Sequence, residues 1–208
     1  EELVGTGRLG RLLLARFYDF ADVYGVPVPT HTWPAESRHE RFPEWPQCPD
    51  WLPECHRATY AWFINAASHD VNLATYFLSG LHVIAARSHA DQAVTTILES
   101  EGTPVMLEIA RAAAGRWLQG AELVFEKGRL TVEIPSPMAT TAAARVVLDE
   151  AGAAGAAFDV PVEWSFAAQA RGFVDCLLGV DRPRTSGEDG LRDLDLTEAI
   201  WRAAASSC

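Results

Sequence analysis

What the sequence lacks limits what this chain can be. No apolar run reaches the roughly 18 residues that a membrane-spanning helix needs, so the sequence predicts no transmembrane segment. Basic residues are few, because 17 Lys and Arg stand against 28 Asp and Glu, and the net charge is -11. Without a local basic stripe, such a surface repels nucleic acid and anionic membranes. We expect neither as a partner.

Cysteine is also scarce, with four residues at positions 48, 55, 176 and 208. No signal peptide is recognisable at the start, so we expect reduced thiols in a cytoplasmic protein. Cys48 and Cys55 share a segment with His31, His39 and His56, which invites a zinc interpretation. Structural zinc normally uses short ligand pairs such as C-x2-C, whereas these two cysteines are seven positions apart. We predict no metal site.

Motifs for nucleophilic and phosphate chemistry are missing as well. No serine stands in G-x-S-x-G, and there is no P-loop. Residues 5–10, GTGRLG, match the dinucleotide motif G-x-G-x-x-G by letter, but that motif works only between a buried strand and a helix. The following stretch RLLLARFYDF reads as a strand. We therefore expect this chain alone to bind no cofactor.

The rest of the composition is that of an ordinary globular protein, 49% hydrophobic and 22% charged in 208 residues. This length suits one domain with a substantial core, and we assign residues 1–208 to a single domain. Residues 27–53 hold seven prolines and three tryptophans, which predicts an inserted irregular loop. Trp33 in this loop is a candidate for stacking on a substrate ring. The alternative is a loop that its own tryptophans pin to the core.

Hydrophobic patterning predicts the fold class. Strands are expected at 81–87, 93–98, 103–111, 120–126 and 129–134, and 139–149 is ambiguous between helix and strand. Helices are expected at 60–80, 164–178 and 188–204. Consecutive strands flanked by helices predict an α+β fold with one large, mostly antiparallel, open-faced sheet and helices on one face.

The segment 60–80, placed on a helix, presents two different stripes. Apolar residues at three- and four-residue steps would face a core. The second stripe consists of Trp62, Asn65, His69, Asn72 and Tyr76. It carries no Lys, Glu or Arg, although exposed helix faces usually do. The second stripe therefore predicts a ligand site, with a solvent-facing side of an amphipathic helix as the alternative.

His69 is the best candidate for chemistry in this stripe. An imidazole titrates near neutral pH, so it can pass a proton to or from a hydroxyl or carbonyl oxygen. Asn65, one turn earlier, would hold the substrate or a water molecule, and Trp62, Asn72 and Tyr76 would bind the substrate. Asp70 points about 100 degrees away on the helix and is interpreted as structural or supporting.

Three stretches carry a family resemblance: N-x3-H-D-V-N-L followed by L-x-G, the strand series ending GAELVFEKGRLTVEIPSP, and the tail G-x-D-G-L-x-D-L-x-L-x-E-A-I. Together they resemble the C-terminal half of the glucose-fructose oxidoreductase and inositol dehydrogenase family (Gfo/Idh/MocA), over nearly the whole chain. His69 matches the family histidine, and Asn65 stands where an aspartate is common. An amide can hydrogen-bond there but cannot share a proton as a carboxylate would.

The resemblance implies more than these residues supply. It implies an N-terminal Rossmann domain, absent from this chain, that binds NAD(P) and ends in a catalytic lysine. It also implies a small-molecule sugar or polyol substrate and a homodimer formed through the exposed face of the sheet. Because the first residue is Glu1 rather than Met, we expect the numbering to begin inside a longer product.

Three hypotheses of function follow. The first is the substrate-binding, catalytic and oligomerisation half of an NAD(P)-dependent oxidoreductase, a fragment or a chain paired with a separate Rossmann domain. The second is a stand-alone non-redox enzyme, an isomerase, lyase or cyclase, with His69 as general acid and base. The third is a non-catalytic binding domain.

Overall fold

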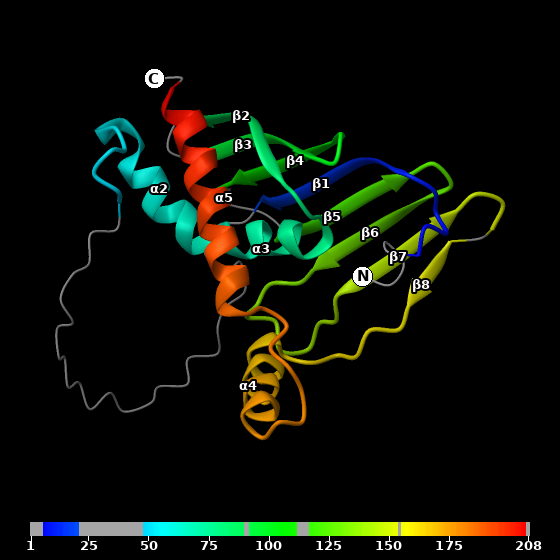
Figure 1. The fold of residues 1–208 in the computed structure, drawn as a ribbon. Coiled ribbons are helices and arrows are strands. Elements are labelled where there is room, and N and C mark those ends of the chain that lie inside the picture. The colour runs from blue at the N-terminus through cyan, green and yellow to red at the C-terminus, as the bar shows by residue number, and fades with distance from the viewer. Residues whose placement is uncertain (1–5, 21–47, 90–91, 112–116, 154, 207–208) are drawn as a thin grey trace.

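A computed structural model describes residues 6–20, 48–89, 92–111, 117–153 and 155–206 of the chain (Figure 1). The helices described are α2 (Glu54–Ala66), α3 (Ser68–Phe77), α4 (Ser165–Leu177) and α5 (Gly187–Ala205). The strands described are β1 (Leu12–Phe20), β2 (His82–His89), β3 (Ala93–Ser100), β4 (Thr103–Ala110), β5 (Leu118–Phe125), β6 (Gly128–Ile134), β7 (Arg145–Glu150) and β8 (Ala156–Phe158).

Eight strands form one sheet in this part of the chain, in the order β2-β3-β4-β1-β5-β6-β7-β8. Neighbouring strands are antiparallel except β1 and β4, which run parallel with Phe17 opposite Leu107. Strand β1, the first in sequence, therefore lies inside the sheet and joins the run β2–β4 to the run β5–β8 (Figure 1). The predicted α+β fold with one large, mostly antiparallel sheet is confirmed.

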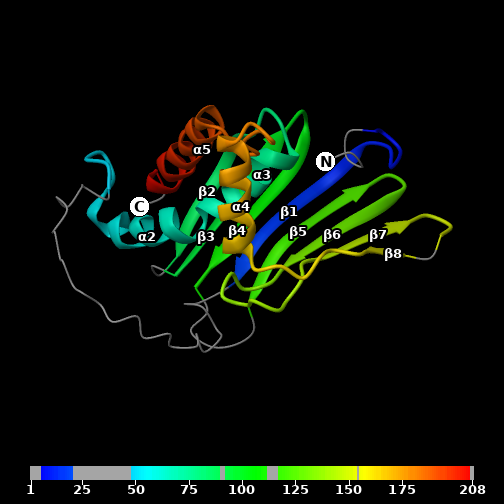
Figure 2. The same cartoon turned by 90° about the horizontal axis from the view of Figure 1, so that it is seen from below.

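Alternating residues give the central strands one buried and one open face. In β1, Ala15 and Phe17 are fully buried, whereas Arg16 between them is only partly buried. Helices α2, α3 and α5 lie over the buried face (Figure 2). On the open face, Arg16 Nε donates to Glu108 Oε2 at 2.5 Å, so charge and apolar surface are mixed there.

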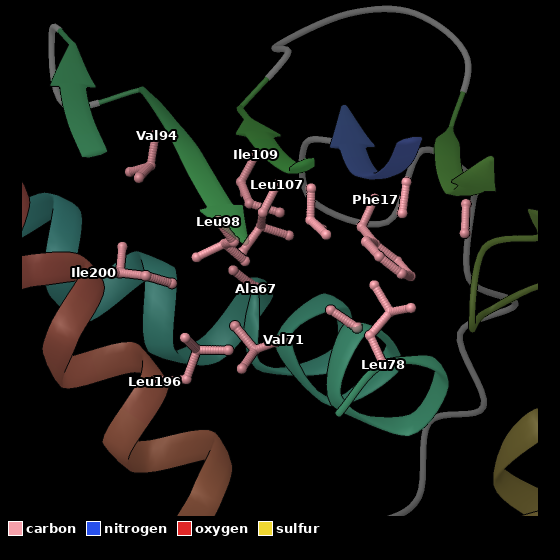
Figure 3. Close-up of a cluster of buried hydrophobic side chains, with 14 of the residues drawn as sticks. Phe17, Ala67, Val71, Leu78, Val94, Leu98, Leu107, Ile109, Leu196 and Ile200 are labelled. Carbon is pink, nitrogen blue, oxygen red and sulfur yellow. The ribbon is translucent and has the colours of Figure 1, made fainter. Parts of the chain in front are cut away.

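The core lies between these helices and the sheet. Figure 3 shows Val71 of α3 and Ile200 of α5 pointing toward Leu98 and Leu107 of the strands. All four side chains are fully buried. Burial of each such aliphatic side chain contributes about 1.5–3 kcal/mol to folding before entropy is counted. This packing fixes the position of α3, which carries His69, Asn72 and Tyr76 of the predicted site.

The helix expected at 60–80 is in fact two helices that meet at Ala67. The amide of Ala67 donates to the carbonyl of Phe63 at 2.7 Å, while its own carbonyl accepts from Val71 at 2.9 Å. Helix α2 begins earlier than expected, directly after Pro53, a residue type suited to helix starts. Helix α3 ends before Gly80, because Leu78 is extended. The apolar stripe is nevertheless buried as predicted at Ala67, Val71, Ala74 and Leu78.

The ambiguous segment 139–149 also divides into two parts. Its end forms strand β7, which pairs with β6, whereas 139–144 has no regular helix or strand. The valines at 146 and 147 therefore decide the outcome, because β-branched residues fit a sheet better than the alanines before them. The three-residue strand β8 was not predicted.

The end of the proline-rich loop packs onto the helical layer. Leu52 is buried, and the Arg202 guanidinium of α5 lies 4.2 Å from the ring centroid of Trp51. This cation–π contact supports the interpretation that a tryptophan pins this end of the loop. The candidate Trp33, at the other end, lies outside the described residues.

Within the described ranges, every helix is too short or too polar to cross a bilayer. The described cysteines, Cys48, Cys55 and Cys176, form no disulfide with one another. No group of three His, Cys, Asp or Glu residues that could hold a metal ion occurs in the same ranges.

Candidate functional site

His69 is exposed at the start of α3, three residues after the end of α2 at Ala66. Its ring makes no hydrogen bond to a described residue. A histidine that packed into the core could not reach a substrate, so the exposed position keeps the predicted role open. Because α2 ends at Ala66 and α3 begins at Ser68, His69 also lies close to the point where the two helices meet.

Two other members of the stripe are largely accessible. Asn65 is exposed in the last turn of α2, and its Nδ2 donates to the carbonyl of Ala61 at 3.0 Å. Tyr76 is exposed as well and lies edge-on to the ring of Phe77. Trp62 is only partly exposed, because it packs against the hydrophobic core. The stripe thus combines accessible polar groups with apolar rings.

The side chain of Asn72 takes part in the contact between α3 and α5. Its Nδ2 donates to Asp193 Oδ2 of α5 at 2.7 Å, and Thr75 Oγ1 donates to Asp193 Oδ1 at 2.6 Å. One carboxylate therefore ties two residues of α3 to α5. The side-chain oxygen of Asn72 accepts no hydrogen bond from a described residue, so this atom is the one left for a ligand.

Below His69, on the sheet side of α3, lies a buried polar cluster that we call the carboxyl cluster: Asp70, Asp19 of β1 and Gln119 of β5. Asp70 is 0% exposed, and Gln119 Nε2 lies 3.2 Å from each of its carboxylate oxygens. Asp19 and Gln119 are register partners across β1 and β5. The Oδ1 atom of Asp19 is buried, and no described residue donates a hydrogen bond to it.

The electrostatics of this cluster are unusual. Burial raises the pKa of Asp70 to about 8, and the charge of nearby Asp19 adds to the rise while the Gln119 hydrogen bond opposes it. Burial also raises the pKa of Asp19 to about 6. Near neutral pH, Asp70 is therefore mostly a neutral carboxylic acid.

Sequence reasoning gave Asp70 only a supporting role and overlooked Asp19 and Gln119. A signal for the cluster was present in the periodicity. Asp70 lies three positions after Ala67 and four before Ala74, both on the buried stripe, and Asp19 continues the buried alternation of Ala15 and Phe17. A carboxyl group at such core-facing positions marks either a buried pair or a site.

Comparisons with known proteins identify the fold. No family model matches the sequence, and no curated protein matches it. KijD10, a 3-ketoreductase from Actinomadura kijaniata solved with TDP-benzene and NADP, superposes with a TM-score of 0.65 at 17% identity, over 98% of this chain and 55% of KijD10. The fold is shared with part of an oxidoreductase.

Two further structures agree. A candidate NADPH-dependent oxidoreductase from Desulfitobacterium hafniense gives a TM-score of 0.69 at 12% identity, over 100% of this chain and 58% of that protein. The dehydrogenase MviM from Clostridium difficile gives 0.56 at 11% identity, over 95% and 56%. This chain therefore spans little more than half the length of the proteins whose fold it shares.

The G-x-G-x-x-G match at residues 5–10 does not have the setting that a nicotinamide dinucleotide needs. The only G-x-G-x-x-G match leads from a turn, with Gly7 and Gly10 at positive φ, directly into strand β1. No helix N-terminus follows it to receive a pyrophosphate, which that motif requires. This match therefore does not mark a dinucleotide site.

Proposed function

We propose that this chain is the substrate-binding, catalytic and oligomerisation half of a cytoplasmic NAD(P)-dependent oxidoreductase of the Gfo/Idh/MocA type. Its substrate would be a sugar, a polyol or a related compound with a hydroxyl or carbonyl group. One observation carries the proposal: an exposed His69, at the sequence position resembling the family histidine, lies in a fold that superposes on KijD10 over 98% of the chain.

His69 is proposed as the group that moves the proton. As an imidazolium it donates a proton to a carbonyl oxygen, and as a neutral imidazole it accepts one from a hydroxyl. Asn65 lies four residues earlier, in the last turn of α2, and its amide would hold the same oxygen or a water molecule. Because an amide is not ionised, position 65 would orient the substrate without sharing the proton.

The remaining stripe residues are proposed to bind the substrate. Tyr76 and Trp62 offer aromatic surface, which suits the apolar face of a sugar ring. Asn72 would accept a hydrogen bond from a substrate hydroxyl through its side-chain oxygen, since its nitrogen donates to Asp193. Trp33 is proposed to complete this surface from the proline-rich loop.

A Rossmann domain, separate or upstream, is the proposed partner that would hold NAD(P). The apolar surface of α4 supports this. None of its residues is buried, Phe173 is 65% exposed and Leu177 is 71% exposed, and α4 stands away from the sheet (Figures 1 and 2). Exposed apolar area of this kind usually marks an interaction surface.

The docking proposal can be tested with Leu177→Glu. We expect this variant to lose association with the nucleotide-binding domain, measured by analytical ultracentrifugation of the two components, while keeping its thermal midpoint. Ile84→Glu on β2 is the control, since Ile84 is 57% exposed on a different element. Equal association of both variants would exclude α4 as the docking surface.

The open face of the sheet is the proposed dimer interface. Ile97 and Leu14 lie there, exposed, beside the Arg16–Glu108 ion pair. This mixture of apolar and paired charged groups is typical of an interface between two copies. Sedimentation velocity tests the proposal: Ile97→Asp should convert a dimer to a monomer, and a monomeric parent protein would contradict it.

The catalytic proposal is tested by His69→Gln in the complex with the nucleotide-binding domain, with a panel of sugars and polyols. We expect kcat to fall by about 100-fold or more, because general acid–base catalysis contributes that much. His89→Gln on β2, which removes another exposed imidazole, is the matched control. Unchanged turnover in His69→Gln would remove the assignment. Turnover by this chain without NAD(P) would instead favour the non-redox alternative.

A further inference from the structure

The carboxyl cluster lies directly behind the proposed catalytic histidine. Asp70 follows His69 in sequence, so the two side chains leave the same helical turn in different directions. His69 is exposed, whereas Asp70 points to the sheet and contacts Gln119 through both carboxylate oxygens. Any movement of the Asp70 backbone therefore moves the base of the His69 side chain.

Apart from the core packing of Ala67 and Val71, the first turn of α3 has few other attachments, and none of the described ones is a polar side-chain contact to the sheet. The residue before it is Ala67, and no side chain caps the helix N-terminus. The amides of Asp70 and Val71 donate to the carbonyl of Ala67, which lies within the same turn. The tie between α3 and α5 through Asp193 begins only at Asn72. Asp70 is thus the polar anchor of this turn on the sheet.

The anchor holds without a cation. In the described part of the chain, Asp19 is the only other ionisable group that acts on Asp70, and β5 contributes the uncharged Gln119. Strand β4 presents the apolar Ile109 beside Asp19, and α5 presents Asp193 to Asn72 and Thr75 instead. Two buried carboxylates without a cation repel each other when both are charged.

We propose that Asp70 is a positioning residue for His69: as a carboxylic acid it holds the first turn of α3 over β5 through Gln119, and loss of its proton beside the buried Asp19 releases that turn. This inference rests on the proposed role of His69. The pKa values raised by burial at Asp70 and Asp19 agree with it, since they leave the cluster with a proton near neutral pH.

Hydrogen exchange of the Val71 amide tests the release. Because an opening that exposes Asp70 lets its proton dissociate, the opening constant should rise about tenfold for each pH unit from pH 6 to pH 8 and then level off. The values are corrected for the intrinsic pH dependence of exchange. Asp70→Asn should remove this rise, since the isosteric amide keeps its shape and has no proton to lose.

Two further variants sharpen the outcome. Asp19→Asn removes the repelling charge, so the rise should level off at a lower pH than in the parent protein. Asp193→Asn, the control on the other side of α3, should change protection by the same factor at every pH. A parent protein whose opening constant is flat between pH 6 and pH 8, or an Asp70→Asn variant with the same slope as the parent, would overturn the proposal.

The histidine itself supplies the second readout. In protein with 13C-labelled histidine, the Cε1–H resonance of His69, assigned by its loss in His69→Gln, should shift with the Asp70 transition and lose that shift in Asp70→Asn. An unchanged resonance together with a pH-dependent opening would show that Asp70 anchors α3 without positioning His69. Failure of the proposed function would appear separately, as full turnover in His69→Gln.

Discussion

The tie between Asn72 and Asp193 allows a quantitative test of how α3 is fixed. The perturbation is a double-mutant cycle of Asn72→Ala, Asp193→Ala and the double variant. The amide nitrogen lies 2.7 Å from a carboxylate oxygen, and hydrogen bonds to charged groups contribute about 1.5–3 kcal/mol. Because both side chains are only partly buried, we expect a coupling free energy at the low end, about 1–2 kcal/mol.

The cycle is needed because the single variants mix several effects. Asn72→Ala raises helix propensity and thereby hides part of the lost hydrogen bond. Asp193→Ala also releases Thr75, whose hydroxyl lies 2.6 Å from the other carboxylate oxygen. Both contributions cancel in the coupling term, provided that they are the same with and without the partner.

The assay is urea unfolding followed by far-ultraviolet circular dichroism, with free energies extrapolated to water. Asn65→Ala combined with Asp193→Ala is the control cycle, since Asn65 bonds to Ala61 of its own helix. We expect that control coupling to stay within about 0.5 kcal/mol. A coupling below about 0.5 kcal/mol for Asn72 as well would refute the tie and would leave the whole amide of Asn72 free for a substrate.

Two other predictions concern the interior. Trp201→Ala should lower the free energy of unfolding by about 3–5 kcal/mol, because Trp201 is fully buried and lies edge-on to Phe63 and Tyr60 at 5.5 Å between centroids. Trp201→Phe should lose less stability, because it removes a buried indole N–H that donates to no described residue. Urea unfolding measures both variants, and a loss under about 1 kcal/mol in the alanine variant would contradict this packing. Asp70 has a folded-state pKa of about 8, above its unfolded value near 3.9, so between these values the folded state binds more protons than the unfolded state. The free energy of unfolding should therefore fall as the pH rises from about 4 to about 8, by up to about 1.4 kcal/mol per pH unit. The free energy of unfolding, measured at pH 5, 6, 7 and 8, should fall less steeply with pH in Asp70→Asn than in the parent protein. Identical slopes in the two proteins would exclude this contribution of Asp70.

Local pattern was enough to predict most of the elements. The β-rich segments between 81 and 134 become strands in the expected order, because alternating apolar residues and short turns leave few other pairings. The buried stripe of Ala67, Val71, Ala74 and Leu78 also follows from helical periodicity. In each of these cases, the residues that decide the structure are close together in sequence.

The features that escaped prediction depend on residues far apart in sequence. Asp19, Asp70 and Gln119 meet only because β1 pairs with β5 and α3 packs above both. Nothing in the local sequence near Ala67 requires a break between α2 and α3, since alanine suits a helix interior. The parallel pairing of β1 with β4 likewise could not be read from either strand alone.

The place of β1 within the sheet has a consequence for how the protein assembles. Strand β1, residues 12–20, pairs with β4, about 90 residues later, and with β5, about 100 residues later. Until β1 pairs with both, the strands β2–β4 and the strands β5–β8 are not joined into one sheet. During synthesis, β1 therefore has no strand partner until β4 and β5 have emerged from the ribosome. A peptide that covers residues 12–20, added in excess during refolding, should compete with β1 for the position between β4 and β5. It should thereby slow the joining of β2–β4 to β5–β8.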